Sequence, residues 1–220
     1  MFASLLPNDI ILGMEIRAKV TEYVRLRIVA ARKEGVHDDK SNHGTTSTTN
    51  DSEAKTTTTP QHHYNNCAVM RTNSMKFLPN YFPRQSISKL FFCFPDPHFK
   101  RKNHPRRIVA ARLLDEYAFV LKDDGGGRLY CITDVRELHD WHVLACDAHP
   151  LFARVLVSTD NNGDTSTTAE YDDDPCVDAM QFKTEEGQKV DRNGGSKYYA
   201  VYERIADSKA VSVDASNFFG

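Results

Sequence analysis

The sequence is poor in cysteine and tryptophan and has no long apolar run. Its five cysteines include no CxxC pair, which argues against a disulfide framework or a zinc ribbon and for a reducing compartment. No apolar stretch reaches the roughly 20 residues that a membrane span needs, and the N-terminus lacks a basic-then-apolar signal pattern. We therefore expect a soluble intracellular protein without a membrane partner.

Phosphate-binding and metal-binding motifs are missing as well. Gly125, Gly126 and Gly127 lie between a predicted helix and a predicted strand, so they are typical of a turn and not of a GxGxxG phosphate cradle. His139 and His142 are one helical turn apart, as metal ligands can be, but no third ligand is evident. The sequence thus predicts no metal site.

Basic and acidic residues form separate clusters along the chain, although the net charge is only −2. A basic cluster follows the apolar run at 91–94, whereas three consecutive aspartates form an acidic group at 172–174. A local basic cluster on a near-neutral chain indicates a patch that meets an anion, and a solvated surface explains it equally well. The cluster comprises Lys100, Arg101, Lys102, Arg106 and Arg107.

Short apolar runs alternate with amphipathic segments along the chain. Segments with apolar residues at helical spacing cover 16–31, 109–121 and 135–145, the last opened by Asp134 and Glu137 at the spacing of a capping box. This alternation predicts an α/β fold with a mostly parallel sheet. The predicted strands cover 10–16, 67–70, 87–94, 128–134, 151–157 and 198–205.

The chain is expected to form one domain over 1–206. Two polar stretches of low complexity, 35–65 and 158–175, interrupt the pattern and are expected to be surface insertions. Residues 207–220 then form a C-terminal tail.

Four side chains follow the ends of predicted strands, where open α/β sheets bind ligands: Glu15, Asn73, Asp96 and Asp134. Glu15 stands where nucleoside-binding sheets place an acid on two ribose hydroxyls, and an acid that favours a helix N-terminus explains it as well. Asp96 is more specific, because Pro95 and Pro97 hold it in a rigid, non-helical turn.

Thr184, Glu185 and Glu186 precede a short polar helix. A threonine N-cap followed by acids in the first helical turn is the simpler interpretation of these residues.

Six blocks of the sequence, taken in order, resemble the tRNA (guanine-N(7)-)-methyltransferase family. The resemblance extends from about Leu5 to Ile205 and is interrupted only by the two polar stretches; PDPHFKRKNH is the most specific part. The blocks are LGMEIR (12–17), RTNSMKFLPNYF (71–82), FFCFPDPHFKRKNHPRR (91–107), ITDVRELHDWH (132–142), HPLF (149–152) and KTEEGQKVDRNG (183–194).

This resemblance implies a Rossmann-like sheet with helices on both faces and S-adenosyl-L-methionine as the methyl donor. Glu15 and Arg17 match the family's acid and arginine beside the adenosine. Asn73 matches the asparagine on the adenine side. Ser74 stands where many relatives have alanine, and Cys93 takes a position that is usually apolar and lines the cofactor.

The resemblance also implies the substrate side of the site. Asp96 matches the catalytic-site aspartate. Thr184 and Glu186 match a threonine and an acid beside the substrate. The resemblance therefore favours a substrate-binding role for these two residues over the interpretation as a simple helix cap. We expect the cluster of five cations to contact tRNA phosphates.

Relatives begin this domain with a first strand and a Gly-rich loop, whereas this chain opens on MFASLLPND, which resembles the end of the following helix. We therefore expect an N-terminally truncated domain. Eukaryotic relatives act in the nucleus with a non-catalytic WD-repeat subunit. The alternatives are an RNA-binding relative or fragment without cofactor binding, and a methyltransferase for a small molecule.

Overall fold

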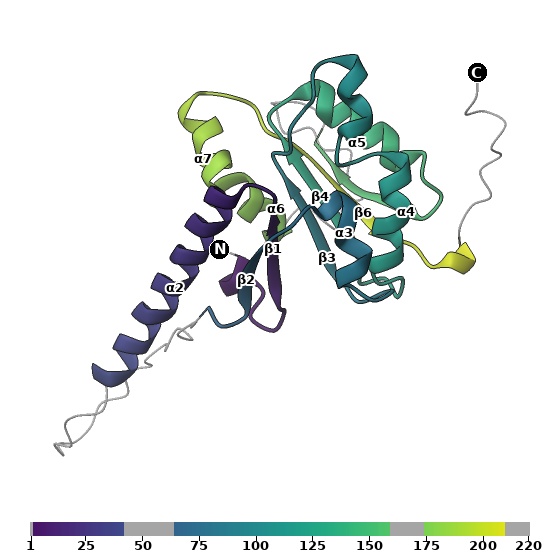
Figure 1. Cartoon of the computed structure of the whole chain (residues 1–220). Coiled ribbons are helices and arrows are strands. Elements are labelled where there is room, and N and C mark those ends of the chain that lie inside the picture. The colour runs from purple at the N-terminus through teal and green to yellow at the C-terminus, as the bar shows by residue number, and fades with distance from the viewer. Residues whose placement is uncertain (1, 42–63, 159–173, 210–220) are drawn as a thin grey trace, which may run out of the picture. The chain divides into compact units, whose positions relative to one another are not determined.

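A computed structural model describes residues 2–41, 64–158 and 174–209, and the chain forms two compact units, Met1–Ser74 and Met75–Gly220 (Figure 1). The two expected insertions and the expected tail lie largely outside the described residues. Helix α2 (Ala18–Ser41) continues to Ser41 and so includes the first residues of the first expected insertion. The single domain over 1–206 stays a prediction.

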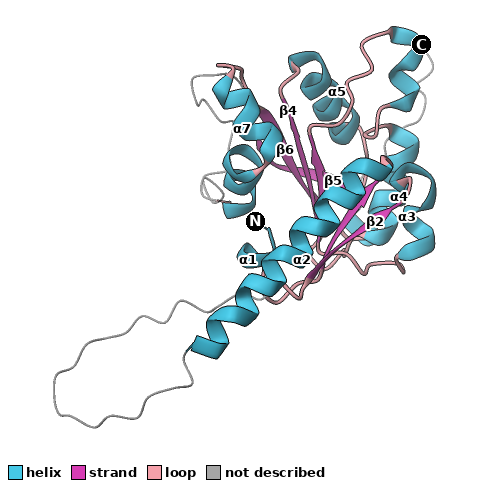
Figure 2. Ribbon diagram, turned by 60° about the vertical axis from the view of Figure 1, so that its left-hand side comes forward, coloured by secondary structure: helices cyan, strands magenta, loops and turns pink. Residues whose placement is uncertain are grey.

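The first unit is a strand–helix–strand arrangement. Two parallel strands pair with Ile11 opposite Cys67 and Glu15 opposite Arg71, and the long helix α2 lies against them (Figure 2). Both strands and the helix fall within two residues of their predicted starts. The elements are α1 (Phe2–Leu5), β1 (Ile11–Glu15), α2 (Ala18–Ser41) and β2 (Cys67–Arg71).

The second unit contains a four-stranded sheet in the order β3-β4-β6-β5. Helix α3 (Ser74–Tyr81), which was not predicted, begins at the boundary between the units. The other elements are β3 (Lys89–Cys93), the 3₁₀ helix η1 (Arg101–Arg106), α4 (Ala111–Val120), β4 (Arg128–Thr133), α5 (Arg136–Asp147), β5 (Phe152–Val157), α6 (Pro175–Asp178), the π-helix η2 (Ala179–Lys183), α7 (Glu185–Arg192), β6 (Tyr198–Arg204) and the 3₁₀ helix η3 (Asp207–Lys209).

Strand direction is that of the mostly parallel sheet that was expected, with β6 as the exception: β3, β4 and β5 share one direction. β3 and β4 are parallel, but β6 lies between β4 and β5 and is antiparallel to both. Hydrophobic patterning identifies a buried strand without encoding its direction, and an antiparallel strand in a parallel sheet is common in α/β folds.

Helices cover both faces of this sheet because successive strand residues point to opposite faces. Phe92 contacts Tyr117 of α4, with 5.0 Å between ring centroids. Its neighbour Phe91 stacks on Tyr130, whose hydroxyl donates to the carboxylate of Asp174, the N-cap of α6, over 2.9 Å. The described part of the unit therefore has a layered α/β core, as predicted.

The expected capping box at the start of α5 is wrong. The N-cap is Val135, whose side chain makes no cap hydrogen bond, and its backbone N–H donates instead to the Thr133 hydroxyl over 3.1 Å. Glu137 does not reach back to the cap because its carboxylate is 2.7 Å from the guanidinium of Arg107.

Candidate cofactor and substrate site

Glu15 ends β1 and is held by the residue two positions later. One of its carboxylate oxygens accepts from the backbone N–H of Arg17 at 2.8 Å and from its Nε at 3.1 Å, and the other accepts from Nη2 at 3.0 Å. This two-pronged pair fixes the carboxylate at the end of the strand. Oε1 accepts two hydrogen bonds and Oε2 accepts one, so Oε2 keeps a further lone pair. The hydrogen bond from Arg17 is the main reason that the pKa of Glu15 lies below its ordinary value.

The neighbouring strand brings Asn73 to the same edge of the two-stranded sheet. Glu15 pairs with Arg71, and the N–H of Thr72 donates to the Glu15 carbonyl over 3.0 Å. Asn73 follows directly, half-buried, and Ser74 begins α3. The structure thus places Glu15, Arg17, Asn73 and Ser74 beside the carboxyl ends of two parallel strands.

Asp96 lies in a strained turn after β3, whose last residue, Cys93, is exposed. Phe94 has φ 50° and His98 has φ 47°, a left-handed conformation that non-glycine residues seldom adopt. Such strain costs on the order of 1–3 kcal/mol per residue and persists where surrounding contacts enforce it, often at functional sites.

The Asp96 carboxylate faces solvent from this turn. Its side chain is 74% exposed, and one oxygen accepts from the backbone N–H of His98 over 3.0 Å. The second oxygen has no hydrogen-bond partner in the described part of the chain. An acceptor held rigidly but not consumed by internal contacts can bind the N–H groups of a ligand.

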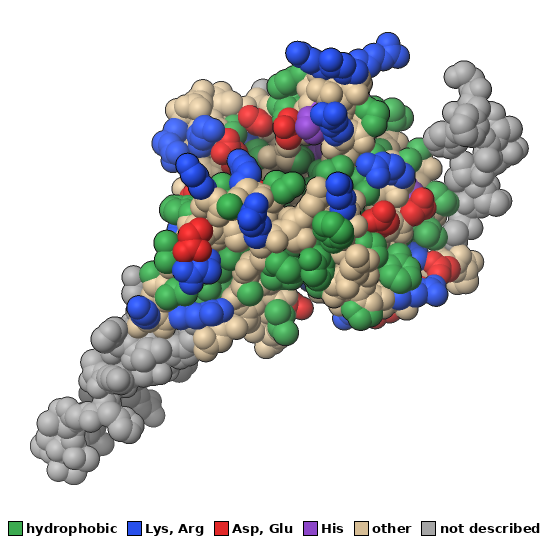
Figure 3. All heavy atoms as spheres, viewed as in Figure 1, with side chains coloured by type: hydrophobic (Ala, Val, Ile, Leu, Met, Phe, Trp, Pro, Cys, Tyr) green, Lys and Arg blue, Asp and Glu red, His purple; other side chains and the backbone are tan. Residues whose placement is uncertain are grey.

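Four of the five clustered cations follow this turn along the chain as exposed side chains. Lys100, Arg101, Lys102 and Arg106 belong to the loop and to η1, and Figure 3 shows Lys and Arg side chains projecting from this end of the unit. They can meet a polyanion. Arg107 cannot do so from its position, because it is only 1% exposed. The expectation that it contacts phosphate is therefore replaced by an internal role.

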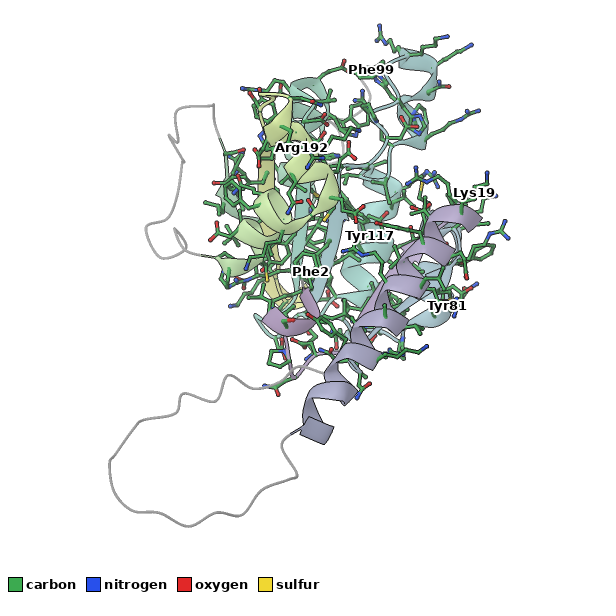
Figure 4. The ribbon with its side chains drawn as sticks, turned by 90° about the vertical axis from the view of Figure 1, so that its left-hand side faces the viewer. Phe2, Lys19, Tyr81, Phe99, Tyr117 and Arg192 are labelled. Atoms are coloured by element: carbon green, nitrogen blue, oxygen red, sulfur yellow. The ribbon has the colours of Figure 1, made fainter. Side chains whose placement is uncertain are left out.

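Sequence reasoning missed Phe99, which stands among these cations. It is 67% exposed and lies on the surface where Figure 4 labels it. An aromatic residue within a basic run is itself a signal of nucleic-acid binding, because bases stack on exposed rings.

Thr184 and Glu186 lie at the start of α7. The Thr184 hydroxyl donates to the Met180 carbonyl at 2.7 Å and accepts from the N–H of Gly187 at 3.0 Å, so it is a helix N-cap. The exposed carboxylate of Glu186 is 2.8 Å from the Lys189 ammonium. A π-helix directly precedes this cap, and π-helical turns are frequent at functional sites.

Within the described residues, no helix is both long and apolar enough to cross a bilayer. The same residues contain no cluster of three or more side chains suited to hold a metal ion. Nε2 of His139 donates to the Ser158 carbonyl over 3.0 Å, and His142 is buried.

The first unit has parallel strands followed by an acid and an asparagine, and the second unit has a mixed sheet with an antiparallel β6. Both features fit the class of Rossmann-like methyltransferases. Residues 1–200 match the model of a family described as "Putative methyltransferase". The chain belongs to this methyltransferase family.

The curated relatives share one printed name, tRNA (guanine-N(7)-)-methyltransferase. The chain is 50% identical to the one from Candida albicans over 202 residues, and 46% identical to the one from Yarrowia lipolytica over 199 residues; in both cases 90% of this chain and 56% of the relative are covered. Identity to the Arabidopsis thaliana protein is 44% over 204 residues, covering 93% of this chain and 66% of the relative. The chain thus spans roughly half to two thirds of these relatives.

Proposed function

We propose that this protein transfers a methyl group from S-adenosyl-L-methionine to N(7) of a variable-loop guanine in tRNA. The observation that carries the proposal is the Asp96 turn, which presents a fixed, exposed carboxylate next to four exposed cations. The names of relatives 42–50% identical to the chain support the same reaction.

The residues of the first unit fit a nucleoside. The Glu15 carboxylate accepts from the vicinal hydroxyls of a ribose, chiefly through Oε2, and Arg17 keeps that carboxylate ionised and oriented. Asn73 offers both a donor and an acceptor to an adenine edge, with Ser74 as a further residue of this unit. The family resemblance assigns Cys93, at the end of β3 in the second unit, to the cofactor as well. S-adenosyl-L-methionine supplies a methyl group on a sulfonium, which is an activated carbon that needs no metal.

Guanine N(7) has an in-plane lone pair, so no proton must be removed before it attacks the methyl carbon. With the methyl donor bound, the bond from its sulfur to that carbon would break as the bond to N(7) forms, and positive charge would pass to the purine. Asp96 and Glu186 accept hydrogen bonds from the N–H groups on the Watson–Crick edge, as positioning and electrostatic groups and not as general bases. Thr184 fixes the start of the helix that carries Glu186.

The exposed cations hold the tRNA. Lys100, Arg101, Lys102 and Arg106 contact phosphates, which position the substrate without reading its sequence. Phe99 stacks on an unpaired base or ribose beside them, since the target base must leave its stack to react.

Calorimetry with S-adenosyl-L-methionine tests the proposal against its rival, a non-catalytic RNA-binding relative. Saturable cofactor binding, together with transfer of a labelled methyl group to tRNA transcripts containing the variable-loop guanine, is the expected result. Binding of tRNA without any heat from the cofactor would favour the rival. A transcript in which 7-deazaguanine replaces that guanine removes the nucleophile and should accept no label.

The proposal includes a non-catalytic WD-repeat subunit and a place in the nucleus. Both rest on the family resemblance alone. Affinity purification of the tagged protein from its own cells, with imaging of the same tag, tests them together.

A further inference from the structure

Arg107 is a buried cation at the end of an exposed basic run. Its neighbour Arg106 is exposed, whereas the Arg107 side chain is 1% exposed and heads the largest fully buried side chains of the described residues. Burial of a guanidinium is costly unless it is paired and hydrogen-bonded, so its contacts must compensate that cost.

Groups from three parts of the chain pair with the buried guanidinium of Arg107 and so compensate its charge. Nε of Arg107 donates to the Pro97 carbonyl over 2.9 Å, and Nη2 lies 2.7 Å from the Glu137 carboxylate and 3.1 Å from Nε2 of His104. The guanidinium also lies over the ring of Trp141, with 4.8 Å to the ring centroid. Arg107 therefore joins the start of the loop, its 3₁₀ helix and helix α5.

The contact with Pro97 falls within the strained part of the loop. Phe94 and His98, both with positive φ, stand on either side of Asp96 and Pro97. The N–H of Phe94 donates to the Ile132 carbonyl over 2.8 Å, which fixes the turn on the strand side. Arg107 supplies the second attachment, on the side away from the strand. A strained turn keeps its conformation only when such contacts over-determine it.

We propose that Arg107 is the positioning residue of the Asp96 turn, with Glu137 and Trp141 orienting its guanidinium. It does not touch the substrate, and it acts by holding the Pro97 carbonyl, and with it the neighbouring carboxylate, in place. The inference deepens the proposed function, because it assigns a role at the same site, and its structural part can be tested without activity.

Arginine is suited to this place and lysine is not. The planar guanidinium presents several donors in a fixed fork, so it binds Pro97, His104 and Glu137 at once while stacking on an indole. A lysine ammonium is a single point charge and cannot span the same partners. Arg107→Lys therefore keeps the charge and removes the attachment.

The test compares Arg107→Lys with Arg106→Ala. Hydrogen exchange by mass spectrometry is followed in peptides covering 94–99 and, as internal reference, in β5 and β6; kcat and KM for tRNA are measured on the same preparations. For Arg107→Lys we expect faster exchange confined to 94–99, a kcat lowered about tenfold or more, and a KM within about twofold. Arg106→Ala should raise KM and leave exchange in 94–99 unchanged.

Glu137→Gln is a milder second variant, in case Arg107→Lys folds poorly. It keeps a hydrogen-bond acceptor for Arg107 and should shift exchange and kcat in the same direction by a smaller factor. Unchanged exchange in 94–99, equally faster exchange throughout the unit, or an unchanged kcat in an active enzyme would each overturn the inference. If the wild-type protein transfers no methyl group while exchange responds as expected, the proposed function fails and the attachment by Arg107 stands.

Discussion

Neighbouring residues of one basic run have opposite roles. Arg106 projects into solvent, whereas Arg107, one position later, is buried against Glu137 and Trp141. Both are arginines of the same basic cluster and stand next to each other, so the sequence predicts a phosphate contact for both. Only the partners on α5, thirty or more positions away along the chain, distinguish them, and single-sequence patterns do not encode such distant pairs.

Glu15 provides a residue-scale prediction on cofactor binding. Arg17 lowers the pKa of this carboxyl, so the ionised form that accepts ribose hydroxyls persists below the ordinary glutamate range of about 4.3. Affinity for S-adenosyl-L-methionine should therefore stay level as pH falls from 8 to about 5. Glu15→Gln keeps the shape but should weaken binding about tenfold at pH 7.5, by calorimetry. Equal affinities of variant and wild type would contradict this role.

His142 provides a prediction on stability. Its ring is 1% exposed, neither nitrogen has a hydrogen-bond partner among the residues that the structure describes, and burial lowers its pKa to about 3. The unfolded value is about 6.5, so the unfolded chain binds the extra proton between these values, and stability falls as pH falls from 6.5 toward 3. Between these pH values, this group lowers the free energy of unfolding by up to about 1.4 kcal/mol for each pH unit.

His142→Leu should remove that loss. Urea unfolding at pH 7.5 and 5.0 should show a smaller decrease in the free energy of unfolding for the variant than for wild type, and equal or higher stability of the variant at pH 7.5. His149, whose pKa burial also lowers, remains and gives both proteins a residual slope. A variant with the full wild-type decrease would show that His142 is not the responsible group.

At the scale of elements, the hydrophobic pattern of the sequence located most strands and helices, but it missed features that depend on tertiary contacts. The strands β1 to β6 begin within two residues of their predicted starts, because continuous apolar runs mark buried strands. The direction of β6 and the helix α3, which contains Pro79, were not predicted. For α7 the short helix was predicted and a threonine cap was one of two interpretations, but neither the preceding π-helix nor the close contact at Gly187 can be predicted from sequence periodicity.

Gly187 is the residue that makes this contact possible. A Cβ there would lie 2.3 Å from the Gln181 carbonyl oxygen and 2.7 Å from the Thr184 hydroxyl, so backbone would have to shift. Gly187→Ala should destabilise the second unit by about 1–3 kcal/mol in urea unfolding. Gln188→Ala, at an exposed position of the same helix, should change stability by less than about 1 kcal/mol. Similar effects of both changes would show that the close approach is not limiting.

At the scale of the whole molecule, binding of tRNA is predicted to depend on salt through the exposed cations. Lys100→Ala with Arg101→Ala removes two phosphate contacts, so the slope of log K against log salt should flatten by roughly one to two. Arg112→Ala with Lys209→Ala removes two exposed cations from α4 and η3 and should leave the slope unchanged. Identical slopes for the two double variants would remove the phosphate-contact proposal.

The central claim is that Asp96 acts on the reacting base and not on tRNA binding. Asp124 provides a matched control, because its exposed carboxylate also accepts from the backbone N–H two residues later, over 3.0 Å. Single-turnover methyl transfer and tRNA Kd, measured together for Asp96→Asn and Asp124→Asn, test the claim most directly. The account predicts a rate at least about 100-fold lower for Asp96→Asn with Kd changed less than about threefold, and no change for Asp124→Asn. Equal losses of rate and affinity in Asp96→Asn, or a wild-type rate, would contradict it.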